Sequence, residues 1–164
     1  MWPSKLVETR EQLRSTVESL RAAGQTIAFT NGCYDLLHVG HVRSLQGARR
    51  CADRLIVGVN SDASVRRNKR PNLPIVPERE RAELLAALAC VDHVLIFGDP
   101  TVDELLELIR PDAYCKGPEY TMENLPERET VKRLGIRFEN VGDPKDHSTT
   151  GLIQRIVAAH GGRS

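Results

Sequence analysis

The sequence predicts an α/β fold, namely a single domain built on a doubly wound parallel five-stranded sheet with an N-terminal helix. Two observations lead to this prediction. Short apolar runs rich in β-branched residues alternate with longer segments whose apolar residues recur at helical spacing. The chain also has 164 residues, of which 40% are hydrophobic, and this size and composition suit one domain with its own core.

The alternation of elements places helices on both faces of the sheet. The expected strands cover residues 26–30, 55–59, 93–97, 113–116 and 136–140. The expected helices cover residues 8–23, 39–52, 77–89, 102–109, 127–134 and 149–159. We therefore divide the chain into an N-terminal helix packed on the domain (residues 1–24) and the domain itself (residues 25–160).

The first helix carries one narrow apolar stripe, formed by Leu6, Leu13, Val17 and Leu20. We expect this stripe to pack against the domain, with a dimer contact as the alternative.

Charge and composition exclude several classes of function. With 23 basic and 22 acidic residues, the net charge of +1 provides no field for nucleic acid, so we expect a small charged metabolite as partner. The N-terminal residues lack the apolar run of a secretory signal, and no membrane-spanning run follows, which predicts a cytoplasmic protein with no membrane partner. The four cysteines form no Cys-x-x-Cys pair, so we assign no metal site to protein side chains.

The most informative segment is residues 29–41, where a predicted strand turns into a helix. It sets His38 and His41 on either side of Gly40. Unpaired N–H groups and the helix dipole favour an anion at a helix N-terminus, and two imidazoles add further donors there. Gly40 removes the side chain that would keep a nucleotide away. The segment therefore predicts a phosphate-binding turn.

Further polar residues follow the other predicted strands. Because ligands of open α/β sheets bind at the carboxyl ends of the strands, we expect one cleft to collect them. These residues are Thr30, Asn31 and Gly32, then Asn60 and Asp62, then Lys116 and Gly117, and finally Ser148, Thr149 and Thr150.

Residues 38–41 resemble the H-x-G-H signature of the nucleotidyltransferase superfamily, which includes the cytidylyltransferases and class I aminoacyl-tRNA synthetases. Within it, residues 27–156 are most similar to the adenylyltransferase domain of bifunctional heptose 7-phosphate kinase/heptose 1-phosphate adenylyltransferases and their stand-alone counterparts. The resemblance implies a Rossmann-like nucleotidyltransferase fold. The other matching blocks are residues 30–32, 34–35 and 57–62, Arg81, and residues 116–117 and 148–150.

The resemblance also implies roles for individual residues. The catalytic residues would be His38, His41 and Arg81. Nucleotide binding would fall to Thr30, Asn31, Gly32, Gly40, Asn60, Asp62, Ser148, Thr149 and Thr150. Substrate binding would fall to Asp35, Lys116, Gly117 and Tyr120. Arg49 or Arg50 would serve as a phosphate clamp where the relatives carry lysine. Mg2+ would accompany ATP as the co-substrate, and no protein nucleophile is needed.

The activity that the resemblance implies is transfer of AMP from ATP to D-glycero-D-manno-heptose 1-phosphate, giving ADP-heptose for lipopolysaccharide synthesis. A glycerol-3-phosphate cytidylyltransferase and an FAD-synthase-like adenylyltransferase are alternatives, because the sequence does not fix the base. A non-catalytic nucleotide-binding sensor is the alternative from another class.

Several weaker features leave the acceptor and the assembly open. Pro118 stands where relatives in the heptose group have glycine. The basic run of residues 66–70 reads as a solvated loop or as a lid over the phosphates. Because no kinase domain precedes Met1, we expect separate enzymes to supply the acceptor. A homodimer is compatible with the resemblance. We assign catalysis to none of His93, His147 and His160.

Overall fold

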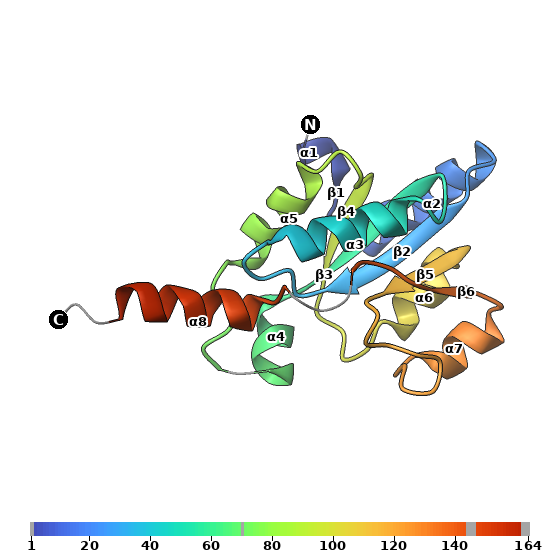
Figure 1. The fold of residues 1–164 in the computed structure, drawn as a ribbon. Helices are drawn as coiled ribbons and strands as arrows, with labels where there is room; N and C mark the ends of the chain where they lie inside the picture. The colour runs from blue at the N-terminus through green and yellow to red at the C-terminus, as the bar shows by residue number, and fades with distance from the viewer. Residues whose placement is uncertain (1, 70, 144–146, 162–164) are drawn as a thin grey trace.

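The computed structural model describes residues 2–69, 71–143 and 147–161. Within these ranges, six parallel strands form one sheet in the order β1-β4-β3-β2-β5-β6 (Figure 1). The strands are β1 (Leu6–Val7), β2 (Ile27–Gly32), β3 (Arg54–Asn60), β4 (His93–Phe97), β5 (Ala113–Lys116) and β6 (Arg137–Asn140). The helices are α1 (Trp2–Lys5), α2 (Arg10–Ala22), α3 (Val39–Arg49), α4 (Asp62–Asn68), α5 (Glu78–Ala86), α6 (Asp103–Ile109), α7 (Arg128–Arg133) and α8 (Thr149–His160).

The predicted fold class is confirmed, but the described sheet has one strand more than the five expected. The extra strand is β1, a two-residue edge strand in which Leu6 pairs with Val94 of β4. Leu6 was expected on the stripe of the first helix, and this expectation is wrong. The reading of the basic run as a loop is also wrong for residues 66–68, which form the end of α4. Arg70 lies outside the described residues.

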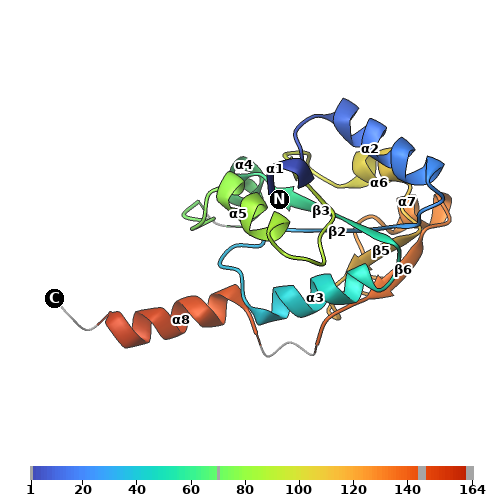
Figure 2. The same cartoon turned by 90° about the horizontal axis from the view of Figure 1, so that it is seen from above.

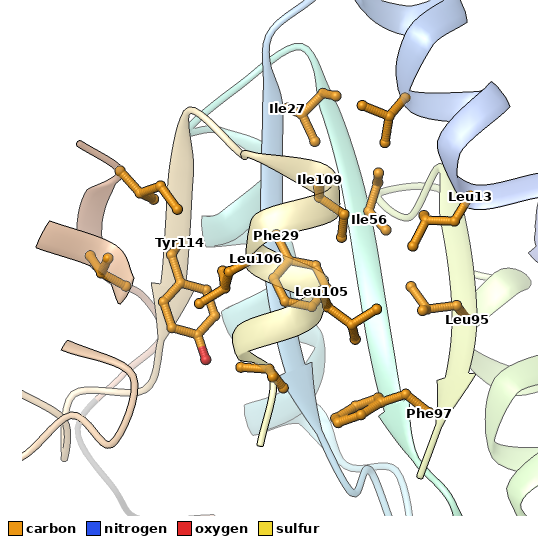
Figure 3. Packing of buried hydrophobic residues seen from close by; sticks show 14 of the residues in the cluster. Leu13, Ile27, Phe29, Ile56, Leu95, Phe97, Leu105, Leu106, Ile109 and Tyr114 are labelled. Carbon is orange, nitrogen blue, oxygen red and sulfur yellow. The ribbon is translucent and has the colours of Figure 1, made fainter. Parts of the chain in front are cut away.

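Side chains alternate between the two faces of the sheet. Ile27 and Phe29 of β2 enter the apolar cluster that includes residues of α2, α6 and α7, whereas Ala28 enters the cluster that includes residues of α3 and α5. Figure 2 shows these two groups of helices on opposite sides of the sheet. Figure 3 shows part of the first cluster, in which Phe29 lies between the strands and α6.

Helix α2 packs on the first of these two layers. Its N-cap is Thr9, whose hydroxyl accepts a hydrogen bond from the backbone N–H of Gln12 at 3.1 Å. Leu13 and Val17 are buried in the cluster with residues of α6. Two of the four residues of the predicted stripe, Leu13 and Val17, are therefore buried by contacts within the chain.

The strand order changes direction at β2. The chain runs from β2 outward through β3 to β4, and later returns to place β5 and β6 on the other side of β2. A crevice opens at the carboxyl ends of the strands where such a reversal occurs. Here, β2 ends at Gly32 and its neighbour β5 ends at Lys116.

Helix α8 extends away from the sheet in both views (Figures 1 and 2). None of its residues is buried, and Ile156 and Val157 are 48% and 61% exposed. In the described part of the chain, no helix is both long and apolar enough to cross a membrane.

Candidate functional site

A cavity of about 500 Å³ lies at the carboxyl ends of the strands, a volume in the usual range of small-molecule sites. It brings together most of the residues that the sequence singled out. The predicted residues that line it are Thr30, Asn31, Gly32, His38, Gly40, His41, Asn60, Lys116, Gly117, Tyr120, Ser148, Thr149 and Thr150. The expectation of one shared cleft is therefore met for these residues, while their individual roles stay predictions.

The two histidines form a stacked pair at the N-terminus of α3. Their ring centroids are 3.9 Å apart, with an interplanar angle of 23°. The backbone N–H of His38 donates to Nδ1 of His41 at 3.4 Å. Because Nδ1 of His41 is the acceptor, the neutral ring carries its proton on Nε2. His41 therefore keeps one N–H donor for a ligand.

Folding favours the neutral form of both histidines. Burial lowers the pKa of His41 to about 4, and the neighbouring His38 and Lys69 contribute to the shift, which Asp35 opposes. Burial also lowers the pKa of His38, with His147 as the second cause. A bound phosphate would oppose these shifts, because an adjacent anion favours the charged imidazole.

Gly40 allows His38 to occupy its place at the cavity. A Cβ atom on Gly40 would lie 3.0 Å from both Cε1 and Nδ1 of His38, and 3.2 Å from Cβ of His147. These separations are too short for the neighbours to stay where they are. The sequence assigned Gly40 to close approach of a nucleotide, and the structure adds close approach of the His38 ring.

The N-terminus of α8 also lines the cavity. Ser148 is the N-cap, and its Oγ accepts from the backbone N–H of Gly151 at 3.0 Å. The hydroxyl of Thr149 donates to the backbone carbonyl of Asp35 at 2.7 Å, which ties α8 to the loop before α3. Two helix N-termini, those of α3 and α8, therefore border the same cavity, an arrangement suited to a polyanion.

Lys116 lies at the edge of the cavity where β5 ends. Its Nζ is 4.6 Å from the centroid of the Tyr120 ring and donates to Oδ1 of Asn31 at 3.3 Å. Burial lowers the pKa of Lys116, while the carboxylates of Glu127 and Glu119 oppose this shift. The cavity thus has a cationic side chain over an aromatic ring at the end of β5.

Arg81 requires a correction, because the resemblance implied a catalytic role for it. Its side chain is 0% exposed and forms an ion pair with Asp62 at 2.8 Å. It also donates to the backbone carbonyls of Cys33, Val76 and Asn60. All three guanidinium nitrogens are thereby used inside the protein, and Arg81 lies outside the described lining of the cavity. It holds the end of β3, the start of α4 and the loop after β2 together.

Asp62 and Asp35 also differ from their predicted roles. Asp62 pairs with Arg81 and lies outside the described lining, so it does not contact a nucleotide in this arrangement. Asp35 is buried, and its carboxylate accepts from the backbone N–H groups of Ile75 and Val76 at 2.9 Å each. Its partners are peptide groups of another loop rather than a substrate.

Arg49 and Arg50 lie at the C-terminal end of α3, far along the helix from the histidines. Arg49 pairs with Asp92 at 3.2 Å and donates to the carbonyl of Ala52. Arg50 is the exposed C-cap residue. The prediction of a phosphate clamp from either residue is wrong, because the N-terminus of this helix, not its C-terminus, borders the cavity.

Several residues that line the cavity were not assigned to the site from the sequence, although Lys69 belongs to the run predicted as a loop or lid and Pro118 to the loop near the acceptor. Lys69, just after α4, is exposed and close enough to His41 to lower its pKa. His147 lies beside His38 and Gly40. The basic run and the position next to Ser148 were the available signals for these two. The others are Cys33, Tyr34, Ser44, Pro118, Glu119, Val141 and Asp143. Closure of residues 66–70 as a lid stays a prediction.

The chain belongs to the cytidylyltransferase-like family, whose model matches residues 29–155. Among its relatives, the bifunctional protein HldE of Syntrophotalea carbinolica is 48% identical over 151 residues. That match covers 92% of this chain and 31% of the relative. The bifunctional protein HldE of Geobacter sulfurreducens is 43% identical, over 94% of this chain and 32% of the relative. The chain therefore spans about a third of the length of these curated relatives.

Solved structures share the fold at lower identity. The lipopolysaccharide core biosynthesis protein from Thermoplasma volcanium GSS1 has a TM-score of 0.64 at 22% identity, and the match covers 74% of this chain and all of that one. A pantoate-beta-alanine ligase from Francisella tularensis also has a TM-score of 0.64, at 19% identity, over 89% of this chain and 69% of that one.

Proposed function

We propose that this chain is a nucleotidyltransferase that transfers AMP from ATP to D-glycero-D-manno-heptose 1-phosphate. The products would be ADP-heptose and pyrophosphate. Membership of the cytidylyltransferase-like family supports the reaction class. The similarity to several bifunctional HldE proteins at 43–48% identity supports the choice of nucleotide and acceptor.

One observation carries the proposal: the stacked histidine pair at the start of α3 and the N-terminus of α8 border one cavity. This arrangement brings imidazole donors together with a helix dipole and hydroxyl groups. A triphosphate bound in this cavity would be within reach of both sets of donors. Preorganised donors of this kind stabilise the charge that develops on a leaving pyrophosphate.

The chemistry requires no covalent intermediate with the protein. An oxygen of the acceptor phosphate attacks the α-phosphorus of ATP in line, and the bond from that phosphorus to the oxygen bridging to the β-phosphate breaks. His38 and His41 donate to the phosphates, and Lys116 holds the acceptor phosphate. The protein thus acts by positioning the two reactants and neutralising their charge.

We propose that Mg2+ enters with ATP. The carboxylates in the described lining of the cavity belong to Glu119 and Asp143, and Asp143 is already paired with Arg43, which fits a cation held mainly by the phosphates of its substrate. Magnesium commonly binds through substrate phosphates and water with few protein ligands. When bound, it would neutralise charge on the phosphates.

The remaining parts of the proposal concern context. We place the reaction in the cytoplasm, as a step that supplies lipopolysaccharide synthesis. We also retain the homodimer as a prediction. The exposed Ile156 and Val157 of α8 offer an apolar surface for such a dimer contact. Light scattering on variants with aspartate at these two positions would measure whether a dimer depends on it.

The test is pyrophosphate release from ATP, CTP, GTP and UTP with Mg2+, each with heptose 1-phosphate, glycerol 3-phosphate or FMN. We expect release with ATP and heptose 1-phosphate. Release with CTP and glycerol 3-phosphate would move the chain to the cytidylyltransferase alternative. Nucleotide binding without release for any pair would favour the sensor.

A further inference from the structure

Two polar residues beneath the cavity have no role in the proposed function, although they contact residues that do. Tyr114, on β5, is fully buried, and its hydroxyl donates to Oδ1 of Asn31 at 2.7 Å. Glu127, just before α7, is 8% exposed, and its Oε2 has no hydrogen-bond partner among the described residues. Both lie outside the described lining of the cavity. Buried polar groups that serve no purpose are costly, so these two call for an explanation.

The Lys116 ammonium and the Tyr114 hydroxyl together hold the Asn31 amide in one orientation. Oδ1 of Asn31 accepts from both Tyr114 and Nζ of Lys116. With its oxygen occupied by two donors, Asn31 is left with the two N–H donors of Nδ2 for the cavity that it lines. Rotation of the amide by 180° would aim Nδ2 at the Lys116 ammonium, which cannot accept, and would break the hydrogen bond that the Tyr114 hydroxyl donates.

Glu127 compensates the charge of Lys116. Lys116 is held between the rings of Tyr114 and Tyr120, with its Nζ 5.8 Å and 4.6 Å from their centroids. The Glu127 carboxylate attracts this ammonium and is the largest influence that keeps it protonated. Tyr114 also lies near the Glu127 carboxyl, whose own pKa is raised by burial and lowered by the Lys116 ammonium. A buried ammonium without such a counter-charge loses its proton more easily.

We propose that Tyr114 and Glu127 are positioning residues that hold Asn31 and Lys116 as one anion-binding pair for the phosphate of the acceptor. Tyr114 helps to hold the Asn31 amide donors toward the cavity, and Glu127 supplies a buried counter-charge near Lys116. The inference rests on the proposed function for the identity of the anion, a sugar 1-phosphate, but not for the existence of the pair.

The first test uses Tyr114→Phe, which removes the hydroxyl alone. We expect the KM for heptose 1-phosphate to rise about fivefold to tenfold, with the KM for ATP unchanged, because one neutral hydrogen bond orients the acceptor site. The same substitution in an Asn31→Ala background should have no further effect, since Tyr114 acts through Asn31. Two results would overturn the role of Tyr114. One is an equal rise in both KM values. The other is a rise in the KM for heptose 1-phosphate that is as large in the Asn31→Ala background as in the unchanged protein.

The second test uses the pH profile of Glu127→Gln, with Glu129→Gln as the matched control. Glu129 is exposed, two residues further along the chain. The groups that face Lys116 and Glu127 are Tyr114, Tyr120, Asp103, Glu119 and Cys33. Loss of the Glu127 charge should lower the pKa of Lys116 further, so acceptor affinity should fall at a lower pH than in the unchanged protein. If acceptor affinity falls at the same alkaline pH in Glu127→Gln as in the unchanged protein, the role of Glu127 is overturned.

A binding measurement separates this inference from the proposed function. Inorganic phosphate is titrated calorimetrically into protein saturated with tripolyphosphate, which occupies the histidine side of the cavity. Tyr114→Phe and Glu127→Gln should each weaken phosphate binding at least threefold, and Glu129→Gln should not. If turnover is absent but phosphate binding weakens in these two variants and not in the control, the proposed function is overturned and the pair is supported. Turnover with phosphate binding unchanged in both variants would overturn the pair.

Discussion

The His38 backbone N–H donates to Nδ1 of His41, and the two rings stack 3.9 Å apart. One histidine therefore fixes the tautomer of the other, and the local backbone of α3 presents both rings to the same cavity. An arrangement that depends on two side chains and one peptide group is sensitive to the loss of any of them.

We predict that His38→Ala and His41→Ala each lower the rate of pyrophosphate release about 100-fold to 1000-fold, because each removes a preorganised donor to the phosphates. The fold should persist, since neither ring belongs to the buried apolar clusters. Turnover assays and circular dichroism would check both parts. His160→Ala, at the exposed end of α8, is the control. Full activity in both variants would exclude the histidine pair from the reaction.

The lowered pKa of His41 predicts a pH-dependent stability. Its pKa is about 4 in the folded protein, against 6.5 for an unperturbed histidine, so the unfolded chain binds the additional proton between these values. The stabilisation is complete above pH 6.5 and is lost as the pH falls toward 4. After allowance for partial exposure, we expect a loss of about 2 kcal/mol in the free energy of unfolding. Urea titrations across this pH range would measure it.

His41→Asn provides the comparison for this measurement, because asparagine keeps a polar side chain but does not titrate. Its unfolding free energy should change less with pH between 6.5 and 4. Equal slopes for the two proteins would show that other groups cause the acid sensitivity.

Gly40→Ala should impair activity through the position of His38. The new Cβ would lie 3.0 Å from two atoms of the His38 ring, so the ring must move away from its stacked position. We expect at least a tenfold lower rate of pyrophosphate release, with a small change in melting temperature. Val39→Ala, at the exposed neighbouring position, should leave the rate near its original value. A Gly40→Ala protein with normal kinetics would show that the ring position is not critical.

Arg81→Met should destabilise the fold rather than merely slow turnover. It removes the partner of Asp62 and of three backbone carbonyls in a fully buried setting. Breaking a buried pair in this way costs about 3–5 kcal/mol. Denaturant unfolding would measure the loss, with Arg79→Ala as the control because the Arg79 side chain is 72% exposed. Unchanged stability together with lost activity would instead favour a direct catalytic role of Arg81 at the phosphates.

The strands with continuous apolar runs could be predicted from sequence, because β2 to β5 are buried on both faces and need such residues throughout. β1 could not, since two residues carry no periodicity and Leu6–Val7 becomes a strand by pairing with β4. The basic residues of α4 were read as a loop, although they belong to a helix whose buried face consists of Ser64 and Val65.

The residues of the site also differ in whether the sequence could place them. Those at strand ends and at helix N-termini, such as Asn31, His38 and Ser148, could be placed from the order of the elements alone. Arg81 and Asp35 could not, because a charged residue in a motif reads the same whether it meets a ligand or the protein's own peptide groups. Several of their partners, Cys33 for Arg81 and Ile75 for Asp35 among them, belong to loops whose paths no local pattern describes.

The hydrogen bond from Thr149 to Asp35 joins residues 114 positions apart. During synthesis, the histidine turn leaves the ribosome long before the threonine that fastens it to α8. At about 5–20 residues per second, the interval is roughly 6 to 23 s. For that time, the nascent chain carries the histidine turn without the hydroxyl that fastens it to α8, so the complete anion site forms only after Thr149 has emerged.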